Sequence, residues 1–174
     1  GPHDILGAPC FVSRSGYTGE DGFEISVPVK DVERLATALL ADPAVRKLSF
    51  TGSTGVGRAL LAEAAKNVIS CSMELGGNAP FLVFEDADLD KAVDGAMLAK
   101  MRNIGEACTA ANRFIVHESV AAEFAERFAA RMAQTRVSPL VEEKQRAKVA
   151  ELVEDAKAAG ARVLTGGEIP SGPG

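Results

Sequence analysis

The chain has 174 residues, and 47% of them are apolar, a composition typical of one or two packed domains. A net charge of −5, with no basic cluster, argues against a nucleic-acid-binding surface. No apolar run is long enough to span a bilayer, and the first residues lack the basic and apolar regions of a secretory signal. The three cysteines, Cys10, Cys71 and Cys108, are too few for a disulfide framework, so we expect a reducing cytoplasm. The two histidines, His3 and His117, do not have the spacing of a metal site.

The first 42 residues predict a β-hairpin followed by a helix. Two strand-like runs, 10–13 and 23–27, flank a segment that is dense in glycine and other turn formers. An amphipathic helix is expected over 31–40, with Asp31 as its N-cap. It should end at Asp42-Pro43, because the residue before a proline disfavours the helical conformation.

Residues 46–75 predict a strand, a glycine-rich turn, a helix and a second strand. The turn is Gly52-Ser53-Thr54-Gly55-Val56-Gly57, and the following helix is expected over 58–66. The second strand is expected over 68–75. A glycine-rich turn between a strand and a helix exposes backbone N–H groups at the positive end of the helix dipole, which favours a bound phosphate.

Two phosphate-binding patterns fit this turn only in part. The outer glycines have P-loop spacing, but Arg58 and Ala59 replace the required lysine and Ser/Thr, so a nucleoside triphosphatase is a poor interpretation. The dinucleotide fingerprint is met except at its middle position, where Thr54 stands. Glu74 follows Gly57 by 74 − 57 = 17 residues, close to the place of a ribose-binding acid. A simple tight connection is the structural alternative.

The remainder of the chain continues the alternation of strands and helices. Asp86-Ala87-Asp88 is expected to cap a helix that runs to about Lys100. Ser119 is expected to cap the next helix. Phe124 and Phe128 are expected in the core. The pattern therefore predicts an α/β fold with mainly parallel strand pairing. The expected strands are 80–84, 113–117 and 162–165, and the later helices are 119–136 and 142–159.

Cys108 is a candidate nucleophile. It lies in Gly-Glu-Ala-Cys-Thr-Ala, a run of small residues with no apolar period, which predicts a loop. A thiol in a loop can be reached by a substrate and activated by a nearby helix terminus. Because free cysteines are usually small buried apolar residues, the residues alone favour a structural role.

Three longer motifs carry a resemblance to a known family. They are FTGSTGVG at 50–57, MELGGNAP at 73–80 and NIGEACTAANR at 103–113. With them, residues 43–174 resemble an internal piece of the aldehyde dehydrogenase superfamily, nearest to its succinate-semialdehyde dehydrogenase group. The resemblance implies a partial fold of that family. Residues 43–75 would end a Rossmann-type dinucleotide-binding domain, and 76–174 would begin the α/β catalytic domain.

The resemblance also implies a site and a reaction. Cys108 would be the nucleophile, and Glu74 would be the general base instead of a ribose ligand. Gly52, Ser53, Gly57 and Leu75 would contact NAD or NADP. A small aldehyde, such as succinate semialdehyde, would be oxidised to a carboxylate through a cysteine thioester. Since further cofactor contacts and a second oxyanion donor lie outside this stretch in the family, we expect weak or no activity and a tendency to form homo-oligomers or aggregates.

The first 42 residues resemble a different family. APCFVSRSGYTGEDGFEISVP at 8–28 is similar to the aminomethyltransferase, or T-protein, of the glycine cleavage system. The resemblance implies a junction of two families within 38–43 and a tetrahydrofolate contact at Tyr17 and Glu24. The alternative is a solvated hairpin loop with a packed tyrosine. We favour that alternative because the rest of a folate pocket is absent.

Overall fold

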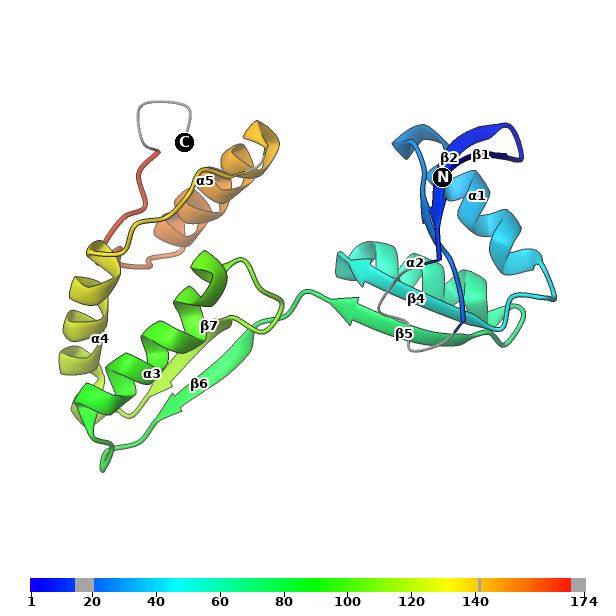
Figure 1. Ribbon diagram of the computed structural model, residues 1–174. Helices are drawn as coiled ribbons and strands as arrows, with labels where there is room; N and C mark the ends of the chain where they lie inside the picture. The colour runs from blue at the N-terminus through cyan, green and yellow to red at the C-terminus, as the bar shows by residue number, and fades with distance from the viewer. Residues whose placement is uncertain (15–20, 141, 170–174) are drawn as a thin grey trace. The chain divides into compact units, whose positions relative to one another are not determined.

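The computed structural model describes residues 1–14, 21–140 and 142–169 of the chain (Figure 1). The chain divides into two compact units, Gly1–Gly76 and Gly77–Gly174, and each is considered by itself. Strands and helices alternate through most of both units, which confirms the predicted α/β class. Within the described residues, none of the helices combines the length and hydrophobicity needed to cross a bilayer.

The first unit begins with a small antiparallel sheet. The predicted hairpin is present, because β2 and β3 pair with Val12 opposite Ile25. A preceding strand, β1, was not expected from the sequence, and it pairs along the other edge of β2. Ala8 and Cys10 are buried against Leu35 of the following helix. The strands are β1 (Pro2–Ile5), β2 (Ala8–Ser13) and β3 (Glu24–Ser26).

Helix α1 (Val29–Ala41) starts earlier than the sequence predicts. Its N-cap is Pro28, with φ −56° and ψ 140°, so the expected cap at Asp31 is wrong. Proline is favourable at a helix start because its fixed φ is preorganised, and Asp31 falls in the first turn, where its charge suits the helix dipole. The helix ends before Asp42, as Pro43 predicts. Leu40 packs with Ala64 and Ile69.

A parallel β–α–β element completes the first unit. Strands β4 and β5 pair in parallel over their full length, and helix α2 crosses between them. Cys71 lies in the expected strand 68–75, where a buried position is predicted, but it is half-buried. Within the described residues β5 has β4 as its single neighbouring strand. The elements are β4 (Lys47–Gly52), α2 (Thr54–Ala65) and β5 (Ser70–Leu75).

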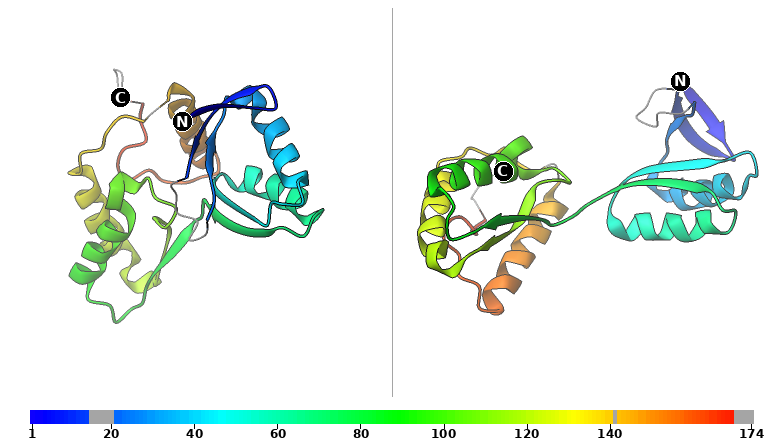
Figure 2. Two further views of the ribbon diagram at one scale, coloured as in Figure 1. Left: turned by 45° about the vertical axis from the view of Figure 1, so that its right-hand side comes forward. Right: turned by 90° about the horizontal axis from the view of Figure 1, so that it is seen from below.

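The second unit contains a second parallel pair, β6 and β7, covered on one face by helices α3 and α4 (Figure 1, Figure 2). Phe124 is 2% exposed, and both it and Phe128 lie in the core as predicted. On the opposite face Leu82 and Ile115 are register partners and are 56% and 57% exposed. The elements are β6 (Ala79–Val83), α3 (Leu89–Met101), the 3-10 helix η1 (Arg102–Gly105), β7 (Ala111–Val116), α4 (Glu118–Ala133) and α5 (Glu143–Ala158).

Of the two helix N-caps predicted in the second unit, the one of α3 is confirmed and the one of α4 is wrong. Asp88 caps α3 as predicted, accepting from the Lys91 backbone N–H at 3.2 Å. The Lys91 ammonium, 3.0 Å from the carboxylate, and this backbone bond lower the pKa of the Asp88 carboxyl. The expected cap at Ser119 is wrong, because α4 begins one residue earlier and His117 Nδ1 accepts from the Ser119 N–H. An imidazole nitrogen satisfies the terminal N–H as a hydroxyl would.

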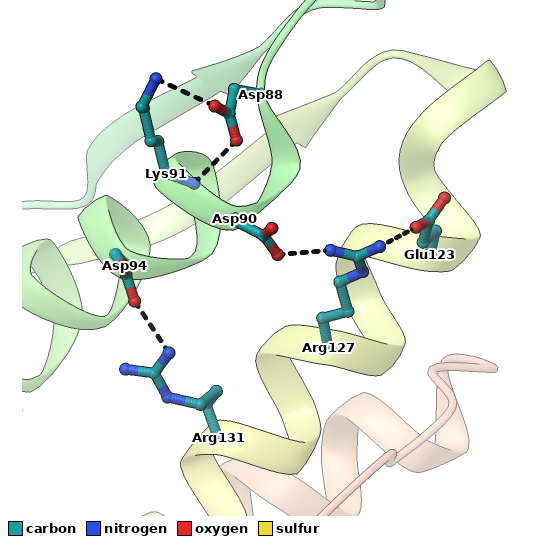
Figure 3. Close-up of polar contacts among 7 residues, drawn as sticks. All are labelled: Asp88, Asp90, Lys91, Asp94, Glu123, Arg127 and Arg131. Atoms are coloured by element: carbon teal, nitrogen blue, oxygen red, sulfur yellow. Dashed lines mark hydrogen bonds and ion pairs between the residues drawn. The ribbon is translucent and has the colours of Figure 1, made fainter.

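Exposed ion pairs join α3 to α4 along their outer surface (Figure 3). Arg127 pairs with Asp90 at 2.6 Å and also with Glu123, and Arg131 pairs with Asp94 at 2.8 Å. Pairs as exposed as these contribute about 0–1 kcal/mol each. The packing of α3 on α4 therefore rests mainly on the apolar core beneath them.

The last expected strand, over 162–165, does not form. Those residues are an exposed irregular segment after α5. A strand needs a neighbour for its backbone hydrogen bonds, and no described strand lies beside this one. The end of α5 itself follows the prediction, since Gly160 has φ +91°, the left-handed conformation that favours glycine after a helix.

Candidate active site

One edge of the β4–β5 pair collects most of the residues predicted to bind a cofactor. Gly52 is opposite Leu75 in the register, and Thr51 is opposite Glu74. Because the strands are parallel, their carboxyl ends meet at the same edge, beside the N-terminus of α2. In open α/β sheets this edge is where ligands bind.

Ser53 forms the N-cap of α2 at this edge. Its hydroxyl accepts from the Val56 N–H at 3.4 Å, and its carbonyl accepts from the Gly57 N–H at 3.0 Å. The helix starts at Thr54, so the predicted open turn is shorter than the glycine pattern suggests. The first N–H groups of a helix have no partner inside it and carry a partial positive charge. These residues therefore fit a phosphate of a dinucleotide.

Gly57 and Leu75 have a packing role at the same place. A Cβ at Gly57 would lie 2.7 Å from Leu75 Cδ2, closer than side-chain carbons approach in proteins. Glycine at this position thus lets α2 pack closely on β5, which is the task of the last glycine in the dinucleotide fingerprint. A Cβ at Gly52 would lie 2.6 Å from the ring of Phe50, so this glycine also leaves space for a neighbour.

Glu74 is exposed on the free face of the same pair. Along β5 half-buried and exposed residues alternate, and Leu75 and Cys71 face α2. Since successive side chains of a strand point to opposite faces, Glu74 points away from α2. Its carboxylate is accessible for proton transfer.

Cys108 is exposed in the loop between η1 and β7, so the predicted loop is confirmed and the predicted burial of a structural cysteine is not observed. The approach to it is kinked, because Asn103 and Ile104 both have φ +53°. Such left-handed conformations cost about 1–3 kcal/mol each in residues other than glycine and concentrate at functional sites. The Asn103 side chain donates to the Glu106 carbonyl at 2.9 Å and closes the turn before Cys108.

Two side chains that the sequence analysis did not single out secure this region. Asn112 donates to the Gly77 carbonyl at 3.1 Å, and Arg113 donates from Nε to the Asn78 carbonyl at 2.9 Å. A Cβ at Gly77 would be 3.7 Å from the Cys108 carbonyl oxygen. Gly77, within the MELGGNAP motif at 73–80, thus lies against the backbone of Cys108.

The predicted catalytic and folate-binding residues belong to different parts of the chain. Glu74 belongs to the first unit and Cys108 to the second, and each is defined within its own unit. Tyr17 lies outside the described residues. Glu24 is exposed on β3, where its carboxylate accepts from the Ser13 hydroxyl at 3.2 Å. Among the described residues, no three His, Cys, Asp or Glu side chains gather as they would around a metal ion.

Comparison with known proteins finds semialdehyde dehydrogenases among the relatives of this chain. The chain is 56% identical to a succinate-semialdehyde dehydrogenase of Paenarthrobacter nicotinovorans, over 78% of this chain and 32% of that protein. It is 46% identical to a glutarate-semialdehyde dehydrogenase of Pseudomonas putida, over 85% of this chain and 33% of that protein. It thus spans about a third of the length of these relatives.

The solved structures agree. The crystal structure of succinate-semialdehyde dehydrogenase from Burkholderia pseudomallei matches with a TM-score of 0.75 and 46% identity, over 82% of this chain and 32% of that one. The structure therefore has a partial aldehyde dehydrogenase fold, as the sequence motifs predict.

The comparisons correct the predicted junction. The family match begins at residue 25, so residues 25–42, which were assigned to a T-protein-like segment, lie inside it. Packing is also continuous there, since Leu40 shares a core cluster with Ala64 and Ile69. A short hairpin and an amphipathic helix are elements common to many folds, and they identify a family weakly. Neither the aminomethyltransferase function nor the folate site at Tyr17 and Glu24 gains support.

The profile of the aldehyde dehydrogenase family matches residues 25–174, most of the chain. Its matched region contains the edge of the β4–β5 pair, Glu74 and the exposed Cys108. The chain belongs to the aldehyde dehydrogenase family.

Proposed function

We propose that this chain carries the nucleophile and the general base of an NAD(P)-dependent semialdehyde dehydrogenase, with Cys108 and Glu74 in those roles. The observation that carries the proposal is the exposure of Cys108 in a kinked loop, in contrast to buried Cys10 and half-buried Cys71. Two relatives of this chain act, by their names, on succinate semialdehyde and glutarate semialdehyde. The proposed substrate is thus a short aldehyde with a carboxylate at its far end.

The proposed chemistry assigns each bond to a residue. The Cys108 thiolate adds to the aldehyde carbon, forming a C–S bond and placing negative charge on the oxygen. The backbone N–H of Cys108 is a candidate donor to that oxygen. A bound nicotinamide would supply the hydride acceptor that turns the adduct into a thioester. Glu74 removes a proton from the water that adds to the thioester, which releases the carboxylate and regenerates the thiol.

The residues proposed to hold the cofactor are those at the β4–β5 edge. Ser53 and the first N–H groups of α2 would bind a phosphate, and Gly52 would let the pyrophosphate approach the backbone. Gly57 and Leu75 support the same site through the close packing of α2 on β5. In this proposal residues 43–75 end a dinucleotide-binding domain and 76–174 begin a catalytic domain, and the division between the two units after Gly76 supports that boundary.

An activated ester tests the nucleophile without a nicotinamide cofactor. In p-nitrophenyl acetate the thiolate attacks the carbonyl carbon, a C–S bond forms, and the C–O bond to nitrophenolate breaks. We expect a burst of nitrophenolate that does not exceed one equivalent per chain, followed by slow turnover. Cys108→Ala should remove the burst, and Cys71→Ala, at a half-buried position, should retain it. A burst of unchanged size in Cys108→Ala would assign the acylation to another residue.

A further inference from the structure

Asn112 lies at a break in the pairing of β6 with β7, four residues after Cys108 in the chain. In the β6–β7 register Ala79 is opposite Ala111, but Pro80 is opposite Arg113, so Asn112 is the extra residue of an irregularity. A bulged residue is left out of the regular ladder, and bulges often lie beside active sites, where they aim a side chain. The amide of Asn112 uses this freedom to reach Gly77, 35 residues earlier in the chain.

The second contact of Asn112 is with Lys100, near the end of α3. Lys100 Nζ is 2.6 Å from Asn112 Oδ1, while Asn112 Nδ2 donates to the Gly77 carbonyl at 3.1 Å. An ammonium group can only donate and a carbonyl can only accept, so the two partners together fix the orientation of the amide. The single side chain of Asn112 thus links the end of α3 to the segment before β6.

Both contacts adjoin the loop that carries Cys108. A Cβ at Gly105 would lie 3.6 Å from Lys100 Cε, and one at Gly77 would lie 3.7 Å from the Cys108 carbonyl oxygen. Lys100 therefore runs along the loop three residues before the cysteine, and Gly77 borders the cysteine itself. Asn112 is four residues after it. The hydrogen bonds of Asn112 thus join two residues, Lys100 and Gly77, that both border the segment carrying Cys108.

We propose that Asn112, with Lys100, is a positioning residue for Cys108, a role that rests on the proposed function of Cys108 as the nucleophile. Asn112 does not touch the substrate. It fixes the backbone of Gly77 and the end of α3 against the loop, and thereby sets the place of the thiol.

The test measures the rate constant of acylation by p-nitrophenyl acetate at saturating ester, together with hydrogen exchange of the amides over 104–111. Asn112→Ala should lower that rate constant about 10- to 100-fold, since a misplacement of about 1 Å can have an effect of this size. Asn112→Asp keeps an acceptor for Lys100 and loses the donor to Gly77, so its rate constant should fall as well. Both variants should speed exchange over 104–111.

Three further variants separate positioning from general destabilisation. Asn67→Ala is the matched control, because Asn67 also donates from its amide to a distant backbone carbonyl, that of Leu40 at 2.8 Å, in the first unit. It should change neither the acylation nor the exchange of the loop. Lys100→Met leaves the Asn112–Gly77 bond in place and should slow acylation, and Lys100→Arg should largely restore it.

The outcomes keep the two proposals apart. Loss of acylation in Cys108→Ala with unchanged acylation and exchange in Asn112→Ala would overturn the positioning role and leave the nucleophile standing. A wild-type rate constant in Asn112→Asp would overturn the contact with Gly77 as its basis. If the unmodified protein is not acylated at Cys108, the proposed nucleophile fails, and unchanged exchange over 104–111 in Asn112→Ala would then refute the positioning role separately.

Discussion

Calorimetric titration of the purified 174-residue chain with NAD+ or NADP+ is expected to show no binding in the micromolar range. A separate assay of nicotinamide reduction is expected to show no turnover of succinate semialdehyde. The described part of the first unit offers a cofactor one two-stranded parallel edge and the N-terminus of α2. An exposed helix terminus contributes about 0.3–1 kcal/mol. Micromolar affinity requires about 8 kcal/mol. The difference would have to come from segments that this chain, about a third of the length of its relatives, does not contain.

The state of the sample decides whether this titration is informative. Among the described residues, β4–β5 and β6–β7 are each a sheet of two strands. Leu82 and Ile115 are exposed on the face of β6–β7 that α3 and α4 do not cover. Parallel sheets are normally covered on both faces, so we expect oligomers or aggregates of the isolated chain. The titration should therefore use a monodisperse fraction from size exclusion. A dissociation constant in the low micromolar range, with reduction of the nicotinamide by a semialdehyde, would refute the prediction.

The second large effect is expected in the core of the second unit. Phe124 is 2% exposed, and its ring centroid lies 5.6 Å from that of Phe128 and 6.3 Å from that of Phe114. Truncation of a buried phenylalanine to alanine costs about 3–5 kcal/mol through lost burial and the cavity that remains. Domains have a total stability of about 5–15 kcal/mol, so Phe124→Ala should remove much of the cooperative unfolding of this unit.

Circular dichroism during urea unfolding measures this effect. Intrinsic fluorescence is a weak probe of this chain, because the chain has no tryptophan and one tyrosine. The matched control is Phe84→Ala. Phe84 is 62% exposed, and a substitution at such a surface position should change stability by no more than about 0.5 kcal/mol. Equal shifts of the unfolding midpoint in the two variants would show that Phe124 is not the centre of the core.

The order and type of most elements follow from the sequence because local pattern determines them. Amphipathic helices and short apolar runs predict α3, α4, β6 and β7, and their apolar positions predict the core around Phe124. The exact helix starts do not follow. Pro28, whose fixed φ suits a helix start, takes the N-cap position of α1 without a side-chain hydrogen bond, and the imidazole of His117 caps α4 in place of Ser119. The strand expected over 162–165 fails because pairing needs a neighbour that a local pattern cannot supply.

The candidate site was predictable to the extent that it is local. A run of small residues predicts the loop of Cys108, and a strand followed by glycines predicts the phosphate edge at Gly52 and Ser53. The contact of Asn112 with Gly77 could not be predicted, since it joins residues 35 positions apart and depends on an irregular register between β6 and β7. The local signal for it is the position of a polar residue, Asn112, directly before the expected strand 113–117.

The proposed roles of Glu74 and Cys108 in one reaction are tested most directly by the lifetime of the acyl-cysteine. After reaction with p-nitrophenyl acetate, peptide mass spectrometry should find the acetyl group on Cys108. Glu74→Gln should acylate normally and then hold the adduct longer, because no carboxylate removes a proton from the attacking water. Glu126→Gln, at an exposed position of α4, should release it at the unmodified rate. An adduct on Cys71, or equal lifetimes on Cys108 with and without the Glu74 carboxylate, would contradict the proposed pair.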